Sequence, residues 1–326
     1  MYFLKQIPED FIVEEIGDYQ LDDKGHYAYF LLKKKNHTTL KAISLLAKEL
    51  GIPEKNIGSA GHKDRIAITT QVISIKNGKK HFESVGARDI SLQFLGNGSE
   101  EIFAGKLKGN RFRITIRNLT DDQIESLQKK SQKNVLMPNF FGEQRFSTNN
   151  VEIGKAILQA RFKDALDIIE KEDKEFAPVI TNYLQSKEND HIGALQKIPV
   201  KILRLYVHSY QSFLFNELLK ECISRKIEID ELPLIGFASS ETDKKIDPIL
   251  DELLKKEKIS TRDFIIPQLR DISAEGESRK AFVPLRDFQI EGTGDDDLNE
   301  KKKKVIVTFS LPRGAYATVL IDYLMQ

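Results

Sequence analysis

A carboxylate between two cations is the strongest candidate for chemistry in this sequence. Lys63, Asp64 and Arg65 follow Gly61, whose missing side chain allows a tight backbone passage, in the segment SAGHKDRIAITTQ at 59–71. An aspartate that nearby positive charge holds ionised can act as a nucleophile or as a base. Such a triplet is also common in surface turns, so a catalytic and a structural interpretation both remain open.

A second segment, MPNFFGEQRFS at 137–147, combines phenylalanines with amide and guanidinium groups. Asn139, Gln144 and Arg145 lie within a few residues of Phe141. This combination suits a nucleobase flipped out of its stack, because a ring stacks on the base while an amide reads its polar edge. A turn that packs phenylalanines into a core would use the same residues, and this alternative also stays open.

Several other chemistries lack support in the sequence. The six histidines and the single cysteine form no HxxxH or CxxC pattern, and there is no P-loop, Rossmann glycine pattern or G-x-S-x-G elbow. We therefore expect no metal and no cofactor. The acidic N-terminal segment lacks the apolar stretch of a signal peptide, and no run approaches the length of a membrane span. These features predict a cytoplasmic protein without membrane contact.

The charge distribution separates two halves of the chain. The net charge is +1, but residues 1–160 contain 24 basic and 19 acidic side chains, and residues 63–117 contain 11 and 5. A basic first half can hold a polyanion such as RNA. Ordinary surface variation would produce a similar imbalance, so charge alone leaves both explanations open.

The first half has the pattern of an α+β domain. Residues 38–51 have helical apolar spacing, and residues 69–78 and 111–119 alternate as strands do. The last strand would present three arginines on the face opposite its isoleucines, and we expect that face to be solvated. These arginines are Arg111, Arg113 and Arg117.

From about residue 152 the pattern becomes helical, and the spacing predicts one buried side of a helix for Leu203, Val207, Tyr210, Leu214, Leu218 and Cys222. The pattern returns to a strand at 305–314 followed by a closing helix. The charged run at 294–304 is expected to form an exposed loop. A helical block between two β-containing blocks indicates an insertion. The predicted fold is α+β, with a mixed, mainly antiparallel sheet built from 1–154 and 277–326 and a mostly helical domain inserted at 155–276.

Two long motifs resemble those of the TruD family of tRNA pseudouridine synthases. AGHKDRIAITTQ resembles the family's small-Gly-x-Lys-Asp-[Arg/Lys] loop, and NFFGEQRF resembles its Asn-[Phe/Tyr]-Phe-Gly-x-Gln-Arg-Phe motif. Further similarities follow in the family's order: KQIPEDFIVEE, LKGNRFRITIR, YQSFLFN and FSLPRGAYATVLI. The resemblance implies a pseudouridine synthase catalytic domain and an inserted TruD-type domain.

The resemblance also implies roles for individual residues. Asp64 occupies the position of the catalytic aspartate, and Lys5 that of a lysine expected to pair with it. Phe141 is expected to pack on the target base. Four residues match substrate-binding positions: Phe11, Asn139, Phe141 and Tyr316. The implied partner is tRNA, with uridine at position thirteen as the target, and we expect a monomer that needs no cofactor and no obligate protein partner.

Pseudouridine formation exchanges a glycosidic bond to uracil N1 for one to C5, and it needs neither redox chemistry nor energy input. Basic residues are candidate phosphate contacts: Lys63, Arg65, Lys106, Lys108, Arg111, Arg113 and Arg117. Three other functions remain to be weighed against this one. They are another RNA-modifying or hydrolytic activity at Asp64, a non-catalytic tRNA-binding module, and an α+β scaffold whose motifs are coincidental.

Overall fold

The chain divides into two compact units in the computed structural model. Unit 1 combines both ends of the chain, Met1–Met137 and Pro284–Gln326, and unit 2 is the intervening Pro138–Val283. The structure describes residues 1–131, 136–147, 149–239 and 244–326. None of the helices in these ranges combines the length and apolarity that crossing a bilayer requires.

The inserted domain was predicted at residues 155–276. Unit 2 begins earlier, at residue 138, and ends later, at residue 283. The reason is local packing. The segment after residue 138 is tied to unit 2 by hydrogen bonds, with Asn139 bonded to Lys280 and Phe141 to Asn216. Because these contacts lie inside unit 2, the phenylalanine motif belongs there rather than to unit 1.

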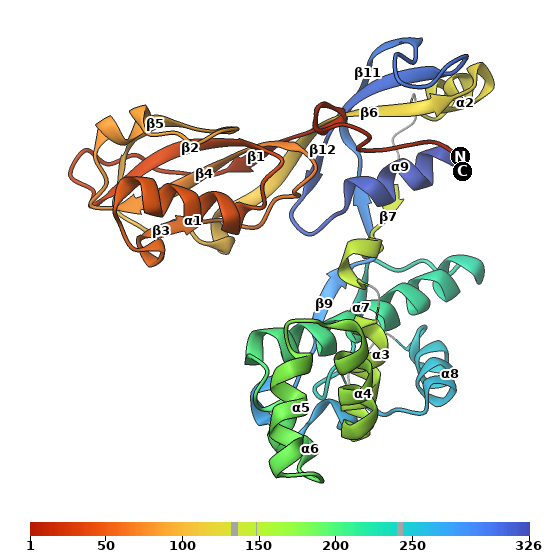
Figure 1. The fold of residues 1–326 in the computed structure, drawn as a ribbon. Helices are drawn as coiled ribbons and strands as arrows, with labels where there is room; N and C mark the ends of the chain where they lie inside the picture. The colour runs from red at the N-terminus through yellow and green to blue at the C-terminus, as the bar shows by residue number, and fades with distance from the viewer. Residues whose placement is uncertain (132–135, 148, 240–243) are drawn as a thin grey trace. The chain divides into compact units, whose positions relative to one another are not determined.

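Unit 1 is built on one mixed, mainly antiparallel sheet (Figure 1), as predicted. Its strands follow the order β11-β12-β6-β1-β4-β2-β5, and β3 pairs with β4 outside this path. In chain order they are β1 Phe11–Gly17, β2 Tyr27–Lys35, β3 Ile57–Ser59, β4 Ile68–Lys76, β5 Ile90–Gly98, β6 Leu107–Leu119, β11 Arg286–Asp295 and β12 Lys303–Pro312.

The pairing of β1 with β4 is parallel, whereas the other pairs in this sheet are antiparallel. Ile12 lies opposite Ile68, so both strands begin at the same edge of the sheet. β2 runs the other way and ends there, with Lys35 also opposite Ile68. The segments before β1 and β4 and the end of β2 therefore meet at one edge.

Helix α1, Thr39–Leu50, covers one face of the sheet (Figure 1), and its limits match the sequence signals. Thr38 caps the first turn by accepting a hydrogen bond from the amide of Lys41 at 3.2 Å, and Gly51 ends the helix with φ at +65°. Ala42, Ile43, Leu46 and Ala47 pack against Phe30, Leu32 and Ile73 in the core. Unit 1 also contains α2, Asp121–Ser131, and α9, Ala317–Met325.

The predicted solvated face of β6 is only partly solvated. Arg111 is exposed and Arg113 is half-exposed, but Thr115 and Arg117 are buried. The burial of Arg117 follows from its ion pairs with Asp10 and with Asp296, which directly follows β11. The run 294–304 is likewise not one exposed loop, because it contributes to β11 and β12 and Asp296 is buried.

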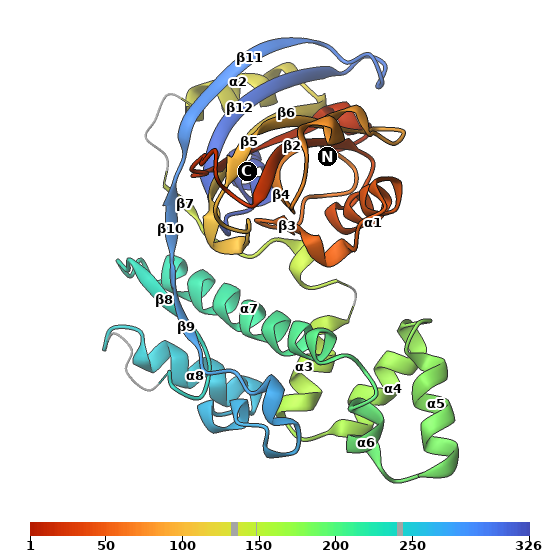
Figure 2. The same cartoon turned by 90° about the vertical axis from the view of Figure 1, so that its left-hand side faces the viewer.

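Unit 2 is mostly helical and centres on α7, the long helix of Figure 2. Its apolar side, from Leu203 to Cys222, is buried as the helical spacing predicted. α3 approaches closely because Gly154 has no side chain; a Cβ there would lie 2.2 Å from the carbonyl oxygen of Tyr206. The helices are α3 Asn150–Leu158, α4 Phe162–Glu172, α5 Ala177–Ser186, α6 His191–Leu195, α7 Val200–Ser224 and α8 Asp247–Glu257.

Two short sheets complete the strands. β8, Glu231–Leu234, pairs with β9, Glu277–Lys280, and β7, Leu136–Pro138, pairs with β10, Phe282–Pro284. Single 3-10 turns occur at η1 Pro8–Asp10, η2 Glu54–Asn56, η3 Lys80–Ser84, η4 Ala104–Lys106, η5 Glu143–Arg145, η6 Thr261–Phe264 and η7 Pro267–Ile272.

Candidate active site

The carboxylate of Asp64 and the ammonium of Lys5 meet at the edge where β1 and β4 begin. Lys5 Nζ donates a hydrogen bond to Asp64 Oδ2 at 2.7 Å, and the two side chains are 15% and 32% exposed. Lys5 lies seven residues before Ile12, and Asp64 lies four before Ile68, its partner in the parallel register. The parallel pairing thus brings two segments far apart in sequence to one point.

Lys5 is held from a second side by an aromatic ring. Its Nζ lies 4.1 Å from the centroid of the Phe11 ring, which favours the charged ammonium. The backbone of Lys5 has φ at +58°, a left-handed conformation that costs a non-glycine residue about 1 kcal/mol or more. Phe11 is only 2% exposed and packs edge-on against Phe112, so the ring that contacts Lys5 is held in place by the core.

Hydrogen bonds from neighbouring elements fix the backbone of the loop that carries Asp64. Thr39, at the start of α1, accepts a hydrogen bond from the amide of Lys63 at 2.9 Å and donates one to Gln71 at 2.8 Å. Gln71 in turn donates to the carbonyl of Gly61 at 3.2 Å. The tight passage predicted at Gly61 is not found, because a Cβ there would meet only Leu107, at 3.9 Å.

Lys34, at the end of β2, is a buried cation directly beneath Asp64. Its Nζ donates to the carbonyl oxygens of His37 at 2.5 Å and of Asp64 at 3.0 Å, and the side chain is fully buried. Burial lowers the pKa of Lys34 to about 8; Asp64 opposes this shift and Lys63 adds to it. Lys34 thus holds the backbone of Asp64 through a hydrogen bond. Burial of its ammonium charge lowers the stability of the folded protein.

This depressed pKa predicts how stability depends on pH. Between pH 8 and 10.5 the unfolded chain holds more protons at Lys34 than the native chain, so the cost of burying the charge is full below pH 8 and is released as pH rises. We expect the free energy of unfolding of the native protein, relative to Lys34→Met, to increase by up to about 3 kcal/mol over this interval. Urea unfolding at pH 7.5, 8.5, 9.5 and 10.5 measures it.

The matched control is Lys41→Met, at an exposed position of α1. Its difference from the native protein should stay constant over the same pH series. A constant difference for Lys34→Met as well would contradict the prediction.

Lys63 is not a phosphate contact. It is buried, its Nζ lies 3.0 Å from Glu15 Oε2, and it donates to Asn110 Oδ1 at 2.6 Å. A lysine with these partners connects the Asp64 loop to β1 and β6. Arg65, the next cation, is exposed and remains a candidate for contact with RNA.

The other predicted phosphate contacts fall into three groups. Lys106, Lys108 and Arg113 form surface ion pairs with Glu100, Asp18 and Glu291 at 2.5, 2.8 and 2.7 Å. Exposed pairs of this kind contribute little stability, so these cations can exchange a carboxylate for a phosphate. Arg111 is exposed.

Arg117 corrects the prediction for that strand. Its guanidinium is buried and binds Asp10 at 2.9 Å, Asp296 at 2.7 Å and Asp297 at 2.8 Å. Its backbone also pairs with Phe3, with N···O distances of 3.0 Å in both directions. Arg117 therefore anchors the segment that carries Lys5 and is unavailable to RNA.

Unit 2 holds the phenylalanine motif in a network of its own. Asn216 of α7 accepts a hydrogen bond from the amide of Phe141 at 2.9 Å and donates to its carbonyl at 3.0 Å. The guanidinium carbon of Arg279 lies 4.1 Å from the centroid of the Phe141 ring. Asn139 is buried and accepts from Arg279 at its Oδ1, at 2.7 Å, so it orients this arginine.

Two of these residues were not predicted from the sequence. Asn216 ends the motif YQSFLFN, and its side chain gives this part of the helix a role in holding the loop. Arg279 lies in β9, where no spacing pattern marks it; only the packing onto Phe141 does. Tyr316 is half-buried at the N-terminus of α9 in unit 1. In the described ranges, no group of three or more His, Cys, Asp or Glu residues could hold a metal.

Comparison with known proteins identifies the class of protein that this fold and site represent. The family model of tRNA pseudouridine synthase D (TruD) matches residues 2–178, 175–233 and 229–323. A probable tRNA pseudouridine synthase D from Methanosarcina barkeri is 31% identical over 99% of this chain and 93% of its own, and a tRNA pseudouridine synthase D from Aquifex aeolicus is 29% identical over 98% and 96%.

A solved structure gives the same result. This chain is similar to a crystal structure of the putative tRNA pseudouridine synthase D from Methanosarcina mazei. The TM-score is 0.78 and the sequence identity 26%, over 99% of this chain and 93% of that one. The chain belongs to the TruD family of tRNA pseudouridine synthases. It is an enzyme that isomerises uridine to pseudouridine in tRNA.

Proposed function

We propose that Asp64 is the catalytic group of this enzyme and that its target is uridine 13 of tRNA. The observation that carries the proposal is the 2.7 Å contact between Lys5 Nζ and Asp64 Oδ2, at a partly exposed position on a rigid sheet edge. The ammonium of Lys5 lies beside the carboxylate, and an ionised carboxylate is the form needed for attack or proton removal. Uridine 13 is inferred from the resemblance of the motifs.

The reaction breaks the bond between ribose C1′ and uracil N1, and a bond between C1′ and C5 replaces it after the base turns. The proton on C5 leaves, and N1 gains one, so atoms and charge balance. Asp64 has three routes that fit this chemistry: addition to the sugar, addition to the base, or removal of the proton at C2′. Each requires the same ionised carboxylate at the same place.

Phe141 is proposed to receive the extruded uracil. Unstacking a base costs a few kcal/mol, and stacking on an aromatic ring returns about 1–3 kcal/mol per base. Asn216 fixes the backbone of Phe141 on both sides, and Arg279 covers part of the ring, so its position is fixed before RNA arrives. Asn139 contributes by orienting Arg279 rather than through an exposed amide.

The proposed target is tested with two tRNA transcripts that differ at one nucleotide. We expect wild-type enzyme to form pseudouridine at position 13 and to leave a transcript with cytidine there unmodified, because cytidine lacks the uracil ring that must be rejoined through C5. Chemical mapping of pseudouridine along both transcripts measures this. A strong signal at another position in both would overturn the choice of target.

The proposal includes a monomeric enzyme that acts in the cytoplasm without a cofactor. Within unit 1 the proposed catalytic pair is Asp64 with Lys5, and within unit 2 the proposed base-stacking residue Phe141 is held by Asn216.

A further inference from the structure

One face of α7 carries a row of polar side chains that runs away from Phe141. Arg204, His208, Ser212 and Asn216 are spaced by four residues, so they lie on neighbouring turns of the same face. The apolar side of α7 faces the core of unit 2, as described above. Figure 2 shows α7 as a long helix of unit 2.

The phenylalanine motif lies along this row. Asn216 holds the backbone of Phe141, Ser212 Oγ accepts a hydrogen bond from Arg145 Nε at 3.1 Å, and Ser209 Oγ donates to the carbonyl of Arg145 at 2.9 Å. The guanidinium carbon of Arg145 lies 5.8 Å from the centroid of the Phe141 ring. The row thus begins at the proposed base-stacking ring and continues directly to a cation.

Two arginines lie along the row: Arg145 near Phe141, and Arg204 at the other end. In the ranges that the structure describes, the guanidinium of Arg145 contacts Ser212 Oγ and the Phe141 ring, and no ion pair with a carboxylate is found for it. Arg204 is exposed and donates to a neutral acceptor, the carbonyl of Asp271, at 2.7 Å. In the described residues, neither guanidinium is therefore neutralised by a carboxylate.

On the face of α7, His208 lies between Arg204 and Ser212, the residue that binds Arg145. Both arginines affect the pKa of its imidazole. Partial desolvation lowers the pKa of His208, Arg145 and Arg204 lower it further, and Glu277 opposes the shift. The imidazole is therefore neutral near pH 7, where it can accept or donate a hydrogen bond without adding charge.

An anion would neutralise the two arginines, and the geometry indicates which one. A guanidinium presents N–H groups in a planar fork that matches the oxygens of a phosphate. We propose that Arg145 and Arg204, with His208 between them, bind a phosphodiester of the RNA backbone next to the nucleotide that stacks on Phe141. This subsite rests on the proposed function of Phe141 and adds the group that positions the strand on which the target lies.

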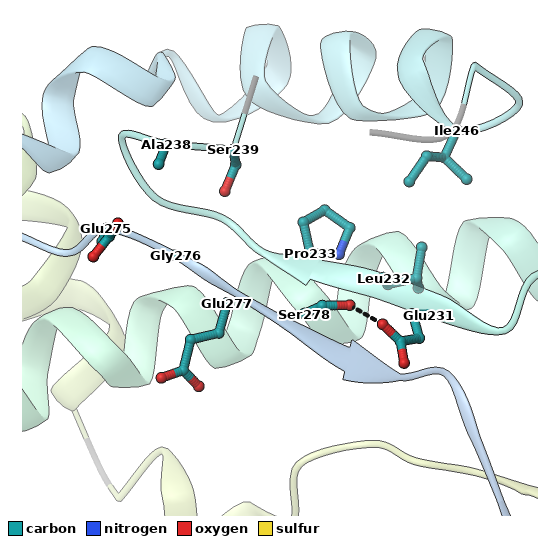
Figure 3. A pocket seen from close by; sticks show the side chains of 10 residues that line it. All are labelled: Glu231, Leu232, Pro233, Ala238, Ser239, Ile246, Glu275, Gly276, Glu277 and Ser278. Carbon is teal, nitrogen blue, oxygen red and sulfur yellow. Dashed lines mark hydrogen bonds between the residues drawn. The ribbon is translucent and has the colours of Figure 1, made fainter. Parts of the chain in front are cut away.

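An acidic pocket in the same unit limits the path of the strand. The pocket, of about 370 Å³, is lined by Glu231, Glu275 and Glu277 among others, and Figure 3 shows Glu231 hydrogen-bonded to Ser278. Carboxylates repel phosphate, so we do not place the RNA strand in this pocket. Glu277 belongs both to the pocket and to the surroundings of His208.

The salt dependence of tRNA binding tests the subsite. Each phosphate contact adds about 0.7–0.9 to the slope of log affinity against log salt concentration. Because the two arginines share one phosphate, we expect Arg145→Gln and Arg204→Gln each to lower the slope by up to that amount and to weaken binding about tenfold. Lys163→Gln, which removes one exposed charge from α4, is the control and should leave the slope unchanged. Wild-type slopes in both arginine variants would overturn the proposal.

A neutral linkage in the RNA distinguishes contact with phosphate from a general loss of charge. A methylphosphonate placed beside the target uridine of a synthetic tRNA should weaken binding to the wild type more than it weakens binding to Arg145→Gln or Arg204→Gln, each of which has lost one partner of that phosphate. Arg204→Gln leaves the motif loop intact, so it gives a result even if Arg145→Gln misfolds. Equal sensitivity in the wild type and in Arg204→Gln, at every linkage flanking the target, would exclude Arg204 as the phosphate ligand.

The result is separable from the role of Asp64. Asp64→Asn should keep the wild-type salt slope while losing turnover. If Asp64→Asn kept wild-type turnover, Asp64 would not be the catalytic group, and the proposed phosphate subsite would be unaffected. Wild-type slopes in the arginine variants would remove the subsite and leave Asp64 standing.

Discussion

Asp64→Asn is expected to lower pseudouridine formation at least about a thousandfold while tRNA binding stays within about threefold of wild type. The amide has nearly the shape of the carboxylate but can neither attack carbon nor take up a proton at neutral pH, and removal of a catalytic group typically costs this much. Single-turnover assays on tRNA, with pseudouridine mapped at position 13, measure the first quantity. Filter binding measures the second.

The matched control is Asp23→Asn, an exposed carboxylate of unit 1. It removes the same charge by the same isosteric change and should retain wild-type turnover. Asp64→Asn itself should fold normally, because the lost ion pair with Lys5 is partly exposed and contributes at most about 1 kcal/mol. Near-normal product from this variant would refute the assignment, and RNA strand cleavage by the wild type would favour a hydrolytic activity at Asp64.

The sequence predicted the carboxylate but not the reason for its position. Motif resemblance pointed to Asp64 and Lys5, which are 59 residues apart. What joins them is the parallel pairing of β1 with β4, in a sheet whose other pairs are antiparallel. Alternation of apolar residues identifies strands and their buried faces, but it does not contain their order or direction.

The same limit explains the wrong prediction for Arg117. Alternation placed it correctly on the face opposite Ile114 and Ile116. Whether that face meets water depends on Asp10 and Asp296, which are 107 and 179 residues away in the chain. No local pattern reveals that two distant carboxylates converge on one guanidinium.

The helical middle shows the opposite case, in which the pattern was right and incomplete. Apolar spacing predicted the buried side of α7, and the structure confirms it from Leu203 to Cys222. The sequence analysis assigns no role to Arg204 or to His208, because no local pattern distinguishes them from other polar residues of the helix. Their significance depends on the loop around Arg145 packing against the same face, which is a tertiary contact.

Arg117→Met is expected to destabilise the protein by about 3–5 kcal/mol, the largest effect on stability that we predict. The substitution leaves Asp10 and Asp296 buried without their cation, and breaking a buried ion pair from one side has a cost of this size. Burial opposes ionisation of Asp296, but hydrogen bonds from Asn118, Leu298, Asn299 and Arg117 outweigh it and lower its pKa to about 2. Urea unfolding at pH 7 measures the loss.

Arg111→Met on the same strand removes the same charge from an exposed position and should change stability by no more than about 0.5 kcal/mol. Adding Asp10→Asn and Asp296→Asn to Arg117→Met should recover part of the loss, because the uncompensated charges disappear. Arg117 also holds the segment that carries Lys5, through Phe3 and Asp10. Below its unfolding temperature, Arg117→Met should therefore turn over tRNA more slowly than Arg111→Met, since the ammonium beside Asp64 has lost its anchor. Equal stability and turnover in the two variants would show that the buried network supports neither the fold nor the site.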